Sequence, residues 1–62
     1  MKVGTIVTAQ GTPFAEYQIL AFKTFTAVLI DVNSKKLHEV SSADLLINYR
    51  YFYHSNFKIE PR

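Results

Sequence analysis

The stretch FTAVLIDVNSKKLHEV, from Phe25 to Val40, carries the clearest secondary-structure signal in the chain. Its first half is apolar on both strand faces from Ala27 to Ile30, which is typical of a central strand covered on two sides. NSKK (Asn33–Lys36) is polar, and its Asn and Ser side chains can hydrogen-bond the neighbouring backbone in a turn. LHEV (Leu37–Val40) then returns, so the stretch predicts a β-hairpin inside a sheet.

Two more strands are predicted before this hairpin. VGTIVTA (Val3–Ala9) is rich in β-branched residues, and QGTP (Gln10–Pro13) interrupts it with a glycine and a proline. EYQILAF (Glu16–Phe22) follows and alternates between two faces. Because one of these faces starts with Gln18, we expect that face to begin in solvent and to become covered further along the strand.

The hydrophobic period changes after the hairpin, in SSADLLIN (Ser41–Asn48). Ser41 stands three residues before Asp44, which is the spacing of a capping box. In that motif the Ser41 hydroxyl accepts from the Asp44 amide, while the Asp44 carboxylate reaches back to the Ser41 amide. Only residues 43–47 remain for a helix, which predicts a single turn of 3₁₀ type. A period of two then resumes and predicts a last, half-buried strand.

With these segments in this order, the chain resembles the small SH3-like β-barrels, including the compact versions found in bacterial and bacteriophage proteins. The segments that carry the resemblance are KVGTIVTA, YQILAF, TAVLID, KLHEV and SSADLL. The resemblance implies an all-β fold, namely a small SH3-like barrel of about five strands with one short helical (3₁₀) turn before the last strand. This barrel would span residues 1–62 as one domain.

Length and composition restrict the classes of protein to consider. The 62 residues suffice for one domain, and a hydrophobic share of 48% favours a folded chain. The formal net charge of +2 is too small to require a polyanionic partner. The chain has no cysteine, which fits a reducing compartment, and no apolar run as long as a signal peptide or membrane helix requires. We therefore expect a cytoplasmic protein that does not enter a membrane.

The sequence offers little support for catalysis or metal binding. A hydrolase needs a nucleophile, a base and a group that orients the base. The only histidines are His38 and His54, and the acidic residues are scattered singly. His38 and Glu39 are adjacent on a predicted strand, so their side chains point to opposite faces. With no metal-ligand spacing and no glycine-rich phosphate loop either, we expect no enzyme activity, no cofactor and no metal.

The C-terminal stretch NYRYFYHSNFKIEPR, from Asn48 to Arg62, concentrates aromatic side chains. Strict alternation would place tyrosines on one face and cations around a phenylalanine on the other: Tyr49, Tyr51 and Tyr53 against Arg50, Phe52, His54 and Lys58. In one interpretation the tyrosines pack on the core and the other face meets a partner; in the reverse interpretation the tyrosines are exposed. Either way, so small a barrel cannot cover every ring, and the remainder predicts an interface.

The predicted partner-binding residues are those of the basic face, joined by two tyrosines if the faces are reversed: Arg50, Phe52, His54 and Lys58, with Tyr51 and Tyr53. Secondary candidates lie in two turns. Phe14 would either cover the end of the barrel or anchor a ligand, and Lys35 and Lys36 would either keep their turn solvated or contact a phosphate. An unpaired strand edge also invites a strand from another protein, or from a second copy to give a homodimer.

These features favour a small non-enzymatic protein-binding module that uses its aromatic and basic C-terminal strand. The resemblance to phage-type barrels suggests a regulator or inhibitor of a host protein. A first alternative is a nucleic-acid-binding domain for single-stranded DNA or RNA, in which cations hold phosphates and an aromatic ring stacks on a base. A second alternative is a structural subunit of a homo-oligomer.

Overall fold

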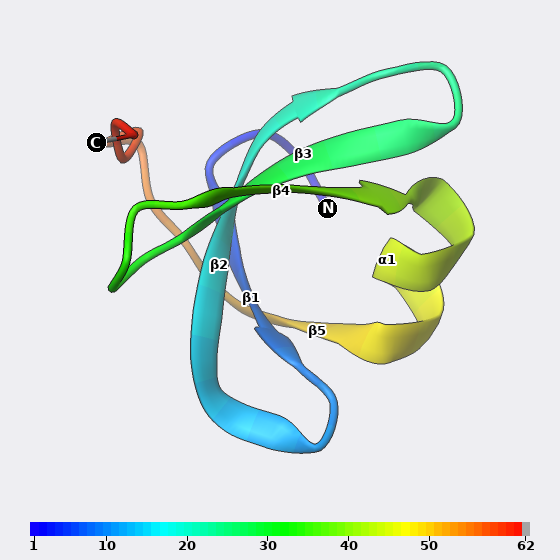
Figure 1. Ribbon diagram of the computed structural model, residues 1–62, viewed down its shortest axis with the longest axis horizontal. Coiled ribbons are helices and arrows are strands. Elements are labelled where there is room, and N and C mark those ends of the chain that lie inside the picture. Colours follow the sequence, from blue (N-terminus) through cyan, green and yellow to red (C-terminus); the bar gives the residue numbers. More distant parts are fainter. Residues whose placement is uncertain (62) are drawn as a thin grey trace.

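The computed structural model describes residues 1–61, with the side chain of Pro13 left aside. Five antiparallel strands form one sheet in the order β4-β3-β2-β1-β5, and a short helix joins β4 to β5 (Figure 1). The elements in chain order are β1 (Thr5–Ala9), β2 (Thr12–Phe22), β3 (Thr26–Asp31), β4 (Leu37–Ser41), α1 (Ser42–Asn48) and β5 (Tyr49–His54). The prediction of an all-β protein with about five strands is confirmed. The sheet is open, however, since β4 and β5 form its two edges and no ladder joins them within residues 1–61.

The helix is longer and more regular than predicted. Residues 42–48 form an α-helix in place of a single 3₁₀ turn, and β5 begins at the next residue, Tyr49, which is the C-cap and has an extended backbone. Ser41 caps it as predicted, with the Asp44 amide donating to Ser41 Oγ over 3.0 Å. The Asp44 carboxylate does not return to the Ser41 amide; it accepts from the side-chain amide of Asn48, four residues ahead. The helix contacts β3, β4 and β5 and thus lies between the two edges of the sheet.

The β1–β2 turn is tighter than the QGTP segment predicts. Ala9 pairs with Thr12, so only Gln10 and Gly11 lie in the turn, and Gly11 has a φ of 87°, in the left-handed region that favours glycine. The ladder shifts directly beside the turn, because the next pair joins Thr8 to Glu16. Residues 13–15 therefore have no partner on β1, and the strand bulges there.

One face of the sheet carries the main apolar core. It is built from side chains of β1, β2 and β3, closed at one end by a leucine of α1: Val7, Ile19, Ala27, Leu29 and Leu45. Tyr17, Val40 and Tyr49 are half-buried against this cluster. The prediction that β3 is covered on both sides is confirmed, since Ala27 and Leu29 on this face and Ile30 on the other are fully buried.

The opposite face is covered by the C-terminal tail, residues 55–61, which follows β5. Gln18 is the anchor of this cover and is fully buried, so the prediction that it begins in solvent is wrong. Its Nε2 donates to the Phe57 carbonyl over 2.8 Å, and its Oε1 accepts from the Ile59 amide over 2.6 Å. Ile6 and Ile30 lie on the same face and are buried as well. The tail ends near the β3–β4 turn, where Pro61 shares a hollow with residues 34–37.

Candidate functional site

The candidate site is built on β5, which is an edge strand paired only with β1 among the described residues (Figure 1). The pairing is regular from Tyr49 to Tyr51 and then shifts, because Val7 pairs with Tyr51 and Ile6 pairs with Tyr53. Phe52 is therefore an extra residue in the edge strand, which is a β-bulge. A bulge bends the strand and redirects the side chains that follow it.

The bulge overturns the predicted division of β5 into odd and even faces. Cross-strand partners share a face of a sheet, so Tyr51 lies on the face of Val7 and Arg50 lies on the opposite face with Thr8. Beyond the bulge the parity is reversed. Tyr53 pairs with Ile6 on the Arg50 face, and His54 pairs with Thr5 on the Tyr51 face. Neither of the two predicted arrangements therefore holds along the whole strand.

The prediction that aromatic area is left over is confirmed. Tyr51, Phe52 and Tyr53 are 61%, 55% and 45% exposed. The interpretation in which the tyrosines pack on the core is therefore wrong for Tyr51 and Tyr53, although Tyr51 lies on the same face of the sheet as Val7. The Phe52 and Tyr53 rings contact each other edge to face, with centroids 5.0 Å apart. Three consecutive aromatic side chains thus lie in solvent on one edge strand, and two of them support each other.

Tyr49 fixes the start of this strand to the core. Its ring meets Tyr17 edge to face at 5.8 Å, and Tyr17 in turn meets His38 of β4 at 5.5 Å. Burial raises the pKa of the Tyr49 phenol above its ordinary value, with smaller contributions from Tyr17 and Asp44. Tyr49 is therefore a structural residue, while the solvent-exposed rings begin two residues later.

Tyr51 and His54 line one hollow, together with Met1, Lys2 and Thr5. His54 is half-buried, and its Nε2 lies 3.1 Å from Asn56 Oδ1. Its Nδ1 is buried with no hydrogen-bond partner among the described residues. The hollow therefore combines a phenol, an imidazole and a lysine at the junction of the N-terminus with β5.

Arg50 belongs to a different hollow, which it lines with residues 8–11 of the β1–β2 hairpin. In one of its two orientations, the Gln10 side-chain amide forms two hydrogen bonds. Its oxygen then accepts from Arg50 Nη2 over 3.0 Å, and its nitrogen donates to the Ile47 carbonyl over 3.2 Å. Arg50 and His54, two of the predicted partner-binding residues, thus line separate hollows on opposite faces of the strand.

The cations near β5 carry no compensating carboxylate. The ion pair between Lys23 and Glu39, at 3.2 Å, joins the β2–β3 turn to β4. Within residues 1–61 no such pair involves Lys2, Arg50 or Lys58. Hydrogen bonding from Thr26 and the nearby Lys23 ammonium lower the pKa of the Glu39 carboxyl. Lys58 is exposed on the tail rather than on β5, because the strand ends at His54.

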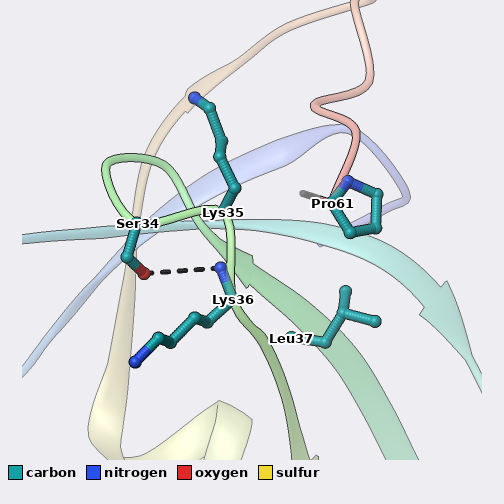
Figure 2. Close-up of a pocket in the computed structure, with 5 residues that line it drawn as sticks. All are labelled: Ser34, Lys35, Lys36, Leu37 and Pro61. Atoms are coloured by element: carbon teal, nitrogen blue, oxygen red, sulfur yellow. Dashed lines mark hydrogen bonds between the residues drawn. The ribbon is translucent and has the colours of Figure 1, made fainter.

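The secondary candidates are separate from this surface. Phe14 lies in the bulged segment of β2 and is 91% exposed, so it does not cover the sheet. Lys35 and Lys36 line a hollow with Ser34, Leu37 and Pro61, and Figure 2 shows their ammonium groups pointing in different directions. Lys35 adopts a φ of 64°, and its Nζ donates to the Val32 carbonyl, so the two lysines do not converge on one point.

Sequence reasoning missed an apolar surface on α1. Leu45 points into the core, whereas Leu46 and Ile47 are 73% and 70% exposed. A signal for it was present in the three consecutive apolar residues of ADLLIN. Only one face of so short a helix can pack on the core. When three consecutive residues of the helix are apolar, some of them must therefore point into solvent.

Comparison with known proteins yields no relative, because no family model, no curated protein and no solved structure matches this chain. Within residues 1–61, no group of three or more His, Cys, Asp or Glu side chains is arranged to hold a metal ion. The same residues contain no helix with the length and apolar character needed to cross a membrane. The candidate site consequently depends on the surface chemistry of β5 alone.

Proposed function

We propose that this chain is a small, non-enzymatic, cytoplasmic protein-binding module and that the solvent-exposed rings of β5 form its contact. The observation that carries the proposal is the run Tyr51–Tyr53, in which three successive aromatic side chains are exposed on an edge strand. Aromatic side chains and arginine are enriched in the buried centres of protein interfaces. Arg50 directly precedes the run, and no acidic residue lies within β5.

The architecture we propose is that of an SH3-like barrel in a partly open form. The strand order β4-β3-β2-β1-β5, with a short helix before the last strand, supports this likeness. The compact members of that fold in bacteria and bacteriophages make a regulator or inhibitor of a host protein the specific instance that we favour. A fold does not by itself confer a function, so the proposal rests on the surface of β5.

The bulge at Phe52 supports contact through side chains rather than through strand addition. An added strand needs an uninterrupted row of free N–H and C=O groups along the edge. The extra residue interrupts that row on β5 and increases the local twist. The partner would therefore meet the rings of Tyr51, Phe52 and Tyr53, with Arg50 and Lys2 attracting carboxylates at the rim.

The experiment is affinity capture from a native lysate with three immobilised proteins: the natural chain, Phe52→Ala and Phe57→Ala. Phe57 is the matched control, because its ring is exposed and it lies on the tail, outside β5. We expect a protein partner that is retained by the natural chain and by Phe57→Ala, and at least about 10-fold depleted on Phe52→Ala. Equal retention by all three proteins would contradict the role of β5.

Thermal unfolding of the same proteins separates binding from folding. Since Phe52 is about half exposed, we expect the loss of its ring to change the stability by less than ~1 kcal/mol. A much larger destabilisation would make Phe52 a folding residue, and the depletion of the partner would then not report on a binding surface.

The alternative of single-stranded nucleic acid is favoured by the unpaired cations beside exposed rings. Fluorescence anisotropy with labelled oligo(dT) and oligo(U) at ~20 and ~200 mM salt tests it, because the affinity must fall steeply with salt when phosphates are contacted. Arg50→Ala and Lys58→Ala would each reduce the salt slope by about one. Absence of binding at the lower salt concentration removes this alternative.

A further inference from the structure

A second surface, unrelated to β5, consists of apolar side chains along α1 and the residue that precedes β3. We define the α1 ridge as Phe25, Ala43, Leu46 and Ile47, all of which are exposed. A backbone hydrogen bond of 2.8 Å from the Ser42 amide to the Phe25 carbonyl joins the two segments. Ala43, Leu46 and Ile47 follow the i, i+3, i+4 spacing of one helix face.

We propose that the α1 ridge is the contact of a two-fold symmetric homodimer, so that its occupant is the ridge of a second copy of this chain. The proposal goes beyond the binding function of β5, because it concerns different residues and a different occupant. Three properties of the ridge support it, namely its area, its charge and its shape.

The area is large for so small a chain. Phe25, Leu46 and Ile47 are 70–79% exposed, which corresponds to on the order of 400 Å² of apolar surface, within the range of the largest patch on a typical monomer. A stable interface buries about 800 Å² per partner, of which about 60% is apolar. The ridge alone therefore supplies most of the apolar centre that one dimer interface needs.

The ridge itself carries no charge, and the charged side chains beside it have hydrogen-bond or ion-pair partners. Lys23, near Phe25 in the β2–β3 turn, is paired with Glu39 at 3.2 Å. Asp44, the charged residue of α1, accepts from the side chain of Asn48. The four ridge residues themselves are uncharged, so an acidic partner or an anionic lipid surface would find no cation on the ridge. The Asp44 carboxylate, which the neutral Asn48 amide does not neutralise, would repel it. An uncharged apolar surface fits another copy of itself without like-charge repulsion.

The shape of the helix is complementary to itself. Ala43 leaves a shallow position one turn before the bulky Leu46 on the same helix face. When two helices cross about a two-fold axis, Leu46 of one copy can pack over Ala43 of the other, and the reverse contact follows by symmetry. The free edge of β5 is a poorer place for such a contact, because the Phe52 bulge interrupts it.

Dimerisation would place two β5 surfaces on one particle. A partner with two binding sites, or one immobilised at a surface, would then be held more tightly through effective concentration than by a single chain. The α1 ridge would thus set the strength of binding, while β5 sets its specificity.

The test is sedimentation equilibrium of the natural chain, Leu46→Asp and Phe57→Asp, from ~1 μM to ~1 mM. For the natural chain and Phe57→Asp we expect the mass to rise from 7.1 kDa toward twice that value with concentration. Leu46→Asp should raise the dissociation constant of the dimer by about 100-fold or more, because each substitution enters a two-fold interface twice. Since Leu46 is exposed in the single chain, circular dichroism should show a folded variant.

A natural chain that stays at 7.1 kDa up to ~1 mM would overturn the proposal. So would a Leu46→Asp variant that dimerises as tightly as the natural chain, or a Phe57→Asp variant that loses the dimer equally. Flotation of a monomeric chain with phosphatidylcholine vesicles, abolished by Leu46→Asp, would identify lipid as the occupant instead. Failure of the proposed β5 function is distinguishable, because partner capture would then be insensitive to Phe52→Ala whatever the mass in solution.

Discussion

The side-chain amide of Gln18 donates to the main-chain carbonyl of Phe57 over 2.8 Å, and the two residues are 39 positions apart. The same amide nitrogen also donates to the Gly4 carbonyl over 3.2 Å, and Oε1 accepts from the Ile59 amide over 2.6 Å. One fully buried side chain therefore satisfies three main-chain groups from both ends of the chain. An amide can do this because it donates and accepts at once.

Replacing Gln18 with leucine should release the tail. The substitution keeps the approximate volume but leaves the Ile59 amide without a partner and the Phe57 carbonyl with only the 3.4 Å hydrogen bond from Ser55 Oγ. We expect a loss of about 1–3 kcal/mol in the free energy of unfolding. Urea denaturation measures the loss, and faster hydrogen exchange at the Ile59 amide would locate it. Thr24→Val is the control, since Thr24 is exposed between β2 and β3 and the free energy of unfolding should stay within about 0.5 kcal/mol.

Substitution by alanine should have different effects at the two glycines, Gly4 and Gly11. Both have a positive φ, 96° at Gly4 and 87° at Gly11, so alanine is strained at either position by about 1 kcal/mol. At Gly4 a Cβ would also lie 2.5 Å from the Ser55 carbonyl oxygen, whereas at Gly11 it meets open space. We expect Gly4→Ala to destabilise the protein by at least ~2 kcal/mol more than Gly11→Ala, measured by thermal unfolding. Equal costs would show that the tail can move away from Gly4.

Ser41→Ala should weaken α1 at its start. The Ser41 hydroxyl satisfies the Asp44 amide, and the loss of such a cap costs about 0.5–2 kcal/mol. Ser42→Ala is the matched control, because Ser42 is the first helical residue and alanine is a better helix former at that position. Denaturant unfolding of both variants gives the difference. A Ser42→Ala variant that is as unstable as Ser41→Ala would move the cap one residue along the chain.

Features set by neighbouring residues could be predicted from the sequence. The hairpin of residues 25–40 appears in the apolar run and polar turn of its own sequence, and the Ser41 cap appears in a spacing of three residues. The exposure of some aromatic rings near the C-terminus is likewise predictable, because so small a chain cannot bury all of them. These predictions depend on local chemistry or on simple limits of area, and the structure agrees with them.

Features set by distant contacts could not be predicted in the same way. The bulge at Phe52 is defined by its pairing with β1, more than forty residues earlier, and it decides which face Tyr53 and His54 take. Burial of Gln18 depends on a tail that crosses the sheet after β5. The periodicity of the sequence contains no information on either of these distant contacts. The sequence therefore predicts correctly that rings near the C-terminus are exposed, but its assignment of the β5 side chains to two alternating faces is wrong.

Acid should weaken the β3–β4 turn through Asp31. Its Oδ1 accepts from the Asn33 amide over 2.8 Å and from the Ser34 amide over 3.0 Å. The Ser34 amide is the main cause that holds the pKa of Asp31 below its ordinary value; burial opposes it, and the Asn33 amide and the His38 side chain lower the pKa further. A carboxylate with a lowered pKa stabilises the fold above the pKa of the unfolded chain, and that stabilisation is lost as the pH falls through the folded-state value.

Asp31→Asn isolates the charge, because an asparagine oxygen can still accept from both amides. The natural chain should be the more stable of the two at about pH 6, and the gap should close as the pH falls below about 4. Since Asp31 is close to solvent, the gap should be only a fraction of a kcal/mol, so urea midpoints need matched salt. Glu60→Gln, on the tail, controls for the change in net charge. A gap that stays constant down to about pH 3 would show that the Asp31 charge does not stabilise the turn.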